Sequence, residues 1–145
     1  MRILTSLLLC LLFPALVTAA PSALDGDWEY RAPEKDPDHH DPAGFLMSVR
    51  VKGEEICGAF TSFTRDGRKV DGGSFLGRFN QSGSVVYFFN GGFVENAEIG
   101  IARLSFTHDH LVWEVVRPLH VENYILPNAA MRRGTVSHEL PASCK

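Results

Sequence analysis

Two strands and their turns can be read directly from residues 45–67, FLMSVRVKGEEICGAFTSFTRDG. Apolar and polar side chains alternate through most of this stretch, which is the period of a half-buried β-strand. Gly53-Glu54 separates the two runs, and Asp66-Gly67 follows the second with residues that tolerate the positive φ of a type I′ turn. The stretch therefore predicts antiparallel strands joined by tight turns.

The same pattern continues on both sides of this stretch, and no apolar stripe with the helical period of 3.6 residues accompanies it. The predicted strands are residues 26–31, 45–52, 56–65, 75–79, 85–89, 99–106, 111–116 and 128–133. An open meander would leave two sheet edges that invite aggregation, and closure removes both. We expect an all-β antiparallel up-and-down meander of about eight strands closed into a small barrel, with a β-sandwich as the alternative.

Residues 85–89 are apolar on both faces, which is typical of a central strand or of one covered on its outer side. We expect Tyr87 and Phe89 to point inward with other strand aromatics such as Trp113. Val86 and Phe88 share the opposite face and would mark a binding patch if they point outward uncovered.

Residues 1–20 have the three parts of a signal peptide: Arg2, an apolar run over 3–16, and small residues at 17–20. A retained membrane anchor is the alternative, but the run is short for a membrane span. Cleavage leaves about 125 residues, the size of one domain, so we expect a single barrel domain over 21–145. The predicted location is the periplasm or the exterior, without a membrane span.

Two cysteines remain after cleavage, Cys57 in the meander and Cys144 next to the C-terminus. In an oxidising compartment an isolated pair of cysteines is typical of a disulfide, which here would pin the tail onto the sheet. A free catalytic thiol is the alternative. No histidine or basic residue lies beside Cys57 in the sequence to lower its pKa.

Gly26-Asp27-Trp28, at the start of the meander, resembles the Gly-x-Trp opening of the calycin barrels, the group that holds lipocalins and avidins. The resemblance implies an eight-stranded barrel in which Trp28 plugs one end. It also implies that an arginine near the C-terminus, Arg132 or Arg133, packs over the indole ring. It implies an architecture and does not name a ligand.

The segment over residues 32–43 is polar and broken by prolines. Its Asp36, Asp38, His39, His40 and Asp41 are our candidate residues for binding a partner. Imidazole and carboxylate groups also suit divalent metals, but adjacent histidines on such a loop rarely converge on one ion. We therefore expect no metal site and interpret the segment as a solvated loop that contacts a partner electrostatically.

The net charge of −3 argues against nucleic acid as a partner. No motif of a hydrolase, zinc protease or phosphate-binding loop occurs, so we expect neither enzymatic activity nor a cofactor. The leading hypothesis is a secreted or periplasmic binding protein for a protein partner, as an inhibitor of or immunity protein against a hydrolase or toxin. The alternative is a carrier of a small apolar ligand within the barrel. A cleft that joins His39 or His40 with His108 and a carboxylate would favour an enzyme.

Overall fold

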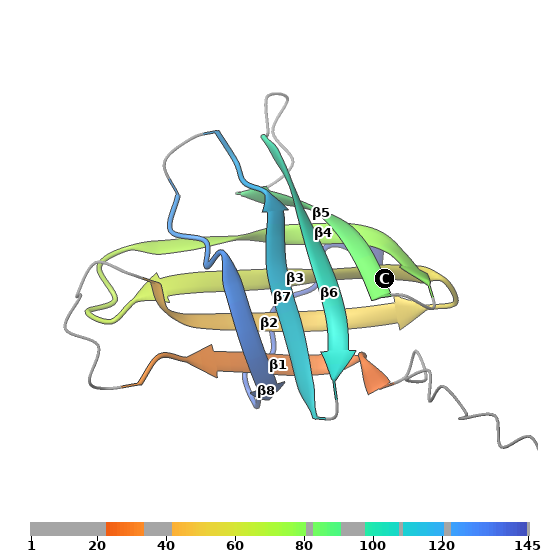
Figure 1. Cartoon of the computed structure of the whole chain (residues 1–145), viewed down its shortest axis with the longest axis horizontal. Coiled ribbons are helices and arrows are strands. Elements are labelled where there is room, and N and C mark those ends of the chain that lie inside the picture. Colours follow the sequence, from red (N-terminus) through yellow and green to blue (C-terminus); the bar gives the residue numbers. More distant parts are fainter. Residues whose placement is uncertain are drawn as a thin grey trace, which may run out of the picture.

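The computed structural model describes residues 23–33, 42–80, 83–90, 98–107, 109–120 and 123–144. Within these ranges, eight antiparallel strands pair in sequence order and close into a barrel through β8 and β1 (Figure 1). The elements are β1 Gly26–Arg31, β2 Pro42–Lys52, β3 Glu55–Thr64, β4 Val70–Asn80, β5 Gly83–Asn90, β6 Ile99–Thr107, β7 His110–Arg117, β8 Asn128–Arg133 and a short 3₁₀ helix, η2, Ala142–Cys144. The predicted barrel is confirmed, and the sandwich is not the fold.

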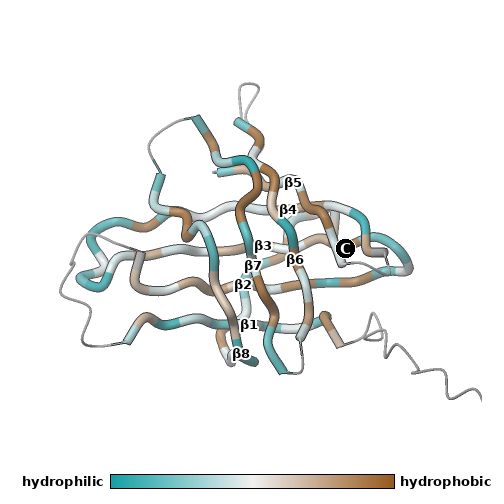
Figure 2. The backbone as a smooth tube through the Cα atoms, viewed as in Figure 1, coloured by the Kyte–Doolittle hydropathy of each residue, from teal (hydrophilic) through white to brown (hydrophobic). Residues whose placement is uncertain are grey.

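Figure 1 shows β6, β7 and β8 crossing β1, β2 and β3 at a steep angle, as expected for the tilted strands of a small closed barrel. Hydropathy alternates along the strands, and hydrophilic residues gather at the hairpin ends of β2–β3 and β3–β4 (Figure 2). The alternation sends every second side chain into the barrel, because successive strand residues point to opposite faces.

Four aromatic rings fill the middle of the barrel. Phe45 on β2, Phe60 on β3, Phe88 on β5 and Trp113 on β7 are all buried. Their ring centroids lie between 5.3 and 6.1 Å apart in the contacting pairs, a separation typical of packed aromatic side chains. These contacts join the two groups of crossing strands across the interior.

Glycines lie directly opposite two of the inward phenylalanines. Gly58 on β3 faces Phe75 on β4, and Gly100 on β6 faces Phe88 on β5. A Cβ atom on Gly58 would lie 2.3 Å from the Phe75 ring, and one on Gly100 would lie 2.1 Å from the Phe88 ring. Each ring therefore covers the main chain of the opposing strand, and these positions have no room for a side chain.

Trp28 closes one end of the barrel. Its Nε1 donates a hydrogen bond to the Leu24 carbonyl at 2.9 Å. The Arg133 guanidinium lies 4.0 Å from the centroid of the indole ring. The same guanidinium donates hydrogen bonds to the carbonyl oxygens of Ala23 and Asp25, at 2.6 and 2.7 Å. Arg133 thus joins the last strand to the segment that precedes the first.

The sequence left open which arginine covers Trp28, and the structure places Arg133 there. Arg132 points elsewhere and donates from Nε to Nε2 of His110 at 3.1 Å. Both arginines belong to the seam of the barrel, where β1 meets β8 through the pairs Trp28↔Arg133 and Glu29↔Arg132.

The segment between β7 and β8 covers the opposite end of the barrel. Leu119, Ile125 and Leu126 are buried there. The Trp113 indole donates from Nε1 to the Leu126 carbonyl at 2.9 Å, and Ser62 Oγ donates to the Tyr124 carbonyl at 2.6 Å. Irregular chain can occupy this buried position because core side chains donate to its carbonyl oxygens.

The predicted orientation of β5 is wrong. Val86 and Phe88 are buried, whereas Val85 and Tyr87 are each 47% exposed. The pairing of β5 with β4 explains the difference, because Phe88 lies opposite the inward Phe75. Directly opposite residues of an antiparallel pair share one face, so the register decides what the apolar pattern left open.

The connection between β3 and β4 also differs from the prediction, because β4 begins at Val70, before the predicted residue 75, and the turn is not the two-residue type I′ turn predicted at Asp66-Gly67. It runs over residues 65–69. Gly67 is the single glycine of this turn, and its φ is 68°. The Asp66 carboxylate accepts hydrogen bonds from the Thr64 hydroxyl at 2.7 Å and from the Arg68 amide at 3.1 Å. These bonds, followed by the charge of Arg68, hold the pKa of Asp66 below its usual range. The side chain of Asp66 thus organises a wider loop than a two-residue turn.

Candidate functional site

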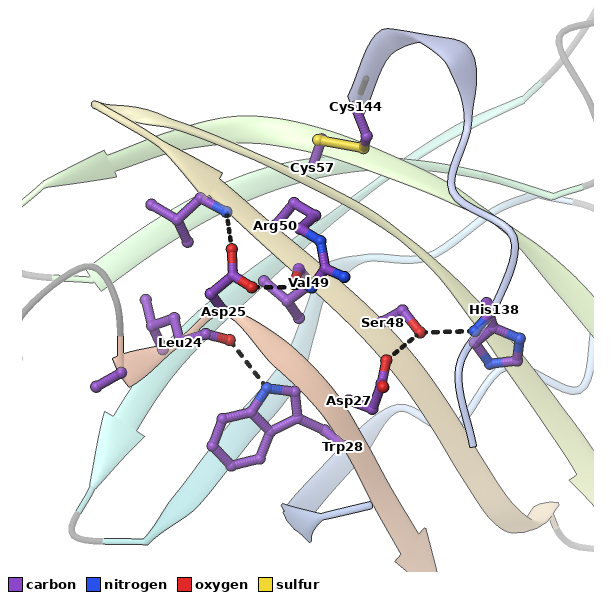
Figure 3. A network of polar contacts seen from close by, with 12 residues as sticks. Leu24, Asp25, Asp27, Trp28, Ser48, Val49, Arg50, Cys57, His138 and Cys144 are labelled. Carbon is purple, nitrogen blue, oxygen red and sulfur yellow. Dashed lines mark hydrogen bonds and ion pairs between the residues drawn. A yellow bond between two sulfur atoms is a disulfide. The ribbon is translucent and has the colours of Figure 1, made fainter. Parts of the chain in front are cut away.

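The C-terminal strap, residues 134–144, crosses the outer side of the barrel from β8 to β3 (Figure 3). The Gly134 amide donates to the Asp27 carbonyl at 2.9 Å. The His138 amide donates to Ser48 Oγ at 2.8 Å, and that hydroxyl donates to Asp27 Oδ1 at 2.7 Å. Ser48 points away from the core yet is buried, because the strap covers it.

The strap ends in the predicted disulfide, which is confirmed. Cys144 in η2 is bonded to Cys57 on β3, with a separation of 5.8 Å between their Cα atoms (Figure 3). Cys57 therefore lies on the outer face of the barrel wall, since Ile56 and Gly58 on either side of it are buried.

A groove opens on the outer wall beside this disulfide. It has a volume of about 660 Å³ and lies over β3, β4 and β5, with the ends of β2 and the strap at its border. We call it the outer groove and define it by Arg50, Lys52, Glu55, Leu76, Arg78, Val85, Tyr87 and the two cysteines. Most of these side chains point away from the barrel core, so the outer groove is separate from the barrel interior.

The floor of the outer groove is apolar. Leu76 is 38% exposed, and Val85 and Tyr87 are each 47% exposed. Leu76 lies directly opposite Tyr87, and Tyr87 lies opposite Ile101 on β6. Single exposed apolar residues are common on protein surfaces, but a contiguous set such as Leu76, Val85 and Tyr87 on the two neighbouring strands β4 and β5 is typical of an interaction site.

The rim of the outer groove is cationic. Arg50, Lys52 and Arg78 lie on it, and Glu55 is the one carboxylate among the lining residues that the structure describes. Arg50 forms an ion pair with Asp25 at 2.8 Å. Neither Lys52 nor Arg78 forms an ion pair with any other residue in the described ranges.

The positive rim contrasts with the net charge of the whole chain, which is −3. Cross-strand pairing places Glu55 opposite Lys52 on β2 and opposite Arg78 on β4. The carboxylate therefore sits between two cations at one end of the groove and offsets part of their charge.

The sequence-predicted partner-binding residues Asp36, Asp38, His39, His40 and Asp41 lie outside the described residues, as do residues 1–20 and His108. His110 is described, and its imidazole contacts Asp109 Oδ1 at 2.6 Å. In the ranges that the structure describes, no group of three or more histidine, cysteine or carboxylate side chains is placed to hold a metal ion. Nor do those ranges contain a helix with the length and apolar composition needed to cross a membrane.

Sequence reasoning missed the outer groove because it placed Tyr87 inside the barrel. The useful signal was the apolar character of both faces of residues 85–89, which requires a second apolar environment outside the core. Basic residues at the ends of neighbouring strands, Arg50, Lys52 and Arg78, were a second signal. Their convergence depends on strand register, which the sequence pattern does not give.

Comparison of the chain with models of protein families, with curated proteins and with solved structures finds no match.

Proposed function

We propose that this protein is a secreted or periplasmic binding protein without enzymatic activity, and that it engages a protein partner through the outer groove. The observation that carries the proposal is the contiguous exposed set of Leu76, Val85 and Tyr87 within a groove of about 660 Å³. Apolar side chains of this size, exposed together on a folded surface, favour burial against a partner.

The closed barrel favours recognition through side chains over recognition through the backbone. A sheet with a free edge can bind a peptide as an additional strand, but here each strand is paired on both sides. The outer groove therefore offers pockets and charges to a partner. A volume of about 660 Å³ lies within the range of pockets that hold ligands or inserted side chains.

Two further features support secretion and a calycin-like architecture within the same proposal. The disulfide between Cys57 and Cys144 is of the kind that persists in oxidising compartments. Arg133 lies over Trp28 at the end of the eight-stranded barrel, which is the arrangement that the resemblance implied. We extend the proposal to inhibition of a hydrolase or toxin, because a rigid barrel cross-linked to its own tail suits a preorganised inhibitor.

Carriage of a small ligand inside the barrel is less well supported than binding at the outer groove. The rings of Phe45, Phe60, Phe88 and Trp113 contact one another across the middle of the barrel, where such a ligand would have to bind.

A pull-down from envelope extract and a panel of cell-wall hydrolases test the proposal. The wild-type protein is compared with Tyr87→Ser, which removes the centre of the outer groove, and with Val116→Ser. Val116 on β7 is 54% exposed and does not line the groove, so it controls for loss of a surface apolar residue.

We expect the wild-type protein and Val116→Ser to retain the same partner or to inhibit the same hydrolase, and Tyr87→Ser to lose this activity. Equal melting temperatures for the three proteins establish that the loss is local. Retention of the partner by Tyr87→Ser would exclude the outer groove as the binding site. The absence of both a partner and an inhibited hydrolase would overturn the proposed function.

A further inference from the structure

We infer that the outer groove binds a short acidic segment of the partner protein, with an apolar side chain of that segment seated on Tyr87. The inference rests on the proposed function and specifies the chemistry of the partner. It combines two properties of the groove that occur together at this place in the fold, an apolar floor and a positively charged rim.

The positive charge of the rim favours a bound segment with negative charge. Lys52 and Arg78 make no ion pair within the described ranges, and Arg50 is paired with Asp25. Glu55 offsets part of this positive charge, but the cations outnumber it along the groove. Carboxylates of a bound segment can therefore approach Lys52 and Arg78 without first breaking an ion pair between described residues.

The apolar floor of the groove favours a bound segment that also carries an apolar side chain. Leu76 and Tyr87 face each other across β4 and β5, and Val85 lies on the same outer face of β5. The Tyr87 hydroxyl makes no hydrogen bond to another residue in the described part of the chain, so it is available to a polar group of the partner. A tyrosine that presents an apolar ring and a free hydroxyl is typical of residues that contribute strongly to binding.

The fixed border of the groove favours a segment over a broad flat surface. The disulfide attaches η2 to the barrel wall beside Arg50 and Lys52. The border of the groove on this side is therefore held by a covalent bond. A protruding loop or an extended terminus can lie along this border and contact Tyr87, which is 47% exposed. The volume of about 660 Å³ accommodates a few side chains.

Defined peptides test this inference without a known partner. The probe is a nine-residue peptide with a central leucine-tryptophan pair flanked by glutamates. One matched peptide has lysine in place of each glutamate, and a second keeps the glutamates but has two serines at the centre. Binding is followed by the backbone amide chemical shifts of the oxidised, full mature protein, which detect weak binding and report where it occurs.

We expect the acidic apolar peptide to shift the amides of Leu76, Arg78, Val85 and Tyr87, and to bind about tenfold more tightly than either matched peptide. Raising the salt concentration to about 0.5 M should weaken its binding severalfold, because the Debye length then falls to a few ångströms.

Three single substitutions have different expected effects on the affinity for the acidic peptide. Arg78→Gln should weaken it about two- to fivefold, and Glu55→Gln should strengthen it by a similar factor. Arg68→Gln changes the net charge as Arg78→Gln does, but it lies in the turn at the other end of β3 and β4, so it should have no effect. A merely structural role of these residues would not produce effects of opposite sign.

The outcomes separate this inference from the proposed function. Equal binding of the acidic and lysine peptides, or equal affinities for Arg78→Gln and Glu55→Gln, would overturn the inference. The inference would also be overturned if no peptide changes the amide chemical shifts of the groove residues while Tyr87→Ser still abolishes capture of a protein partner. In each of these cases the outer groove remains the binding surface of the proposed function, and only the acidic segment is excluded.

Discussion

Substitution of Gly100 by alanine tests the packing of phenylalanine rings over glycine in the barrel interior. The added Cβ would lie 2.1, 2.4 and 2.6 Å from three atoms of the Phe88 ring, whereas ordinary contacts begin near 3.4 Å. The ring would have to move by about 1 Å. It is held by Trp113 and Phe60, whose ring centroids lie 5.3 and 6.1 Å away.

The size of the effect follows from these contacts. Overpacking a core costs about 1 to 3 kcal/mol. Each disturbed aromatic pair adds about 0.5 to 1.5 kcal/mol. Replacing glycine in a strand returns roughly 0.5 to 1 kcal/mol of conformational entropy. We expect Gly100→Ala to lower the free energy of unfolding by about 2 to 4 kcal/mol, which corresponds to a fall of roughly 10 °C in the melting temperature.

A double-mutant cycle measured by urea unfolding identifies the cause. Phe88→Leu alone leaves a cavity, but in the Gly100→Ala background it also relieves the clash. The double variant should therefore be more stable than the sum of the single effects predicts, by about 1 to 2 kcal/mol. Gly44 provides the control, because its added Cβ would meet the ring of Phe63 instead. Gly44→Ala and Phe88→Leu should be additive, and additivity in the Gly100 cycle would refute the reasoning.

Three further predictions concern the barrel seam, the tail and the β3–β4 turn. Cys144→Ser should lower the free energy of unfolding by up to about 4.5 kcal/mol, the chain-entropy value for a loop of 87 residues, measured by urea unfolding of the oxidised protein. Arg133→Met should cost about 1 to 2 kcal/mol through loss of its contact with the Trp28 ring and of its hydrogen bonds, whereas Arg132→Met should cost less; an equal cost would contradict this assignment. Asp66→Asn should destabilise the protein near pH 7, because the lowered pKa of Asp66 gives stability that is present above about pH 4. That stability is lost as the pH falls through the folded-state pKa, so the melting temperatures of wild type and variant should converge near pH 2.

The alternation of apolar and polar residues was sufficient to predict a strand and its inward face where the two faces differ clearly in polarity. The bounds predicted for residues 26–31 and 128–133 agree with β1 and β8, and the alternation over residues 45–52 gave the correct inward face of β2. Closure of the barrel was predicted from the need to remove sheet edges. The pairing of Cys57 with Cys144 was predicted because they are the two cysteines outside the predicted signal peptide.

Features that depend on register were not predictable from the pattern. Residues 85–89 are apolar on both faces, so only their pairing with β4 shows that Tyr87 points outward. The outer groove depends on that orientation and on the path of the strap, which brings Cys144 from the end of the chain to the wall beside Arg50. The extent of the β3–β4 turn depends on side-chain hydrogen bonds of Asp66 that a two-residue turn motif does not include.

The disulfide also determines how the protein would respond to mechanical load. A force applied to the two ends of the described chain passes along residues 23–57 and then crosses the sulfur bridge to Cys144. Strands β4 to β8, together with most of β3, lie outside this covalent path and inside the loop that the disulfide closes. Under stretching, the oxidised protein should therefore extend only by the length of its first two strands and their flanking segments. Strands β4 and β5, which form the floor of the outer groove, could not be pulled out to their full length until the bridge is reduced.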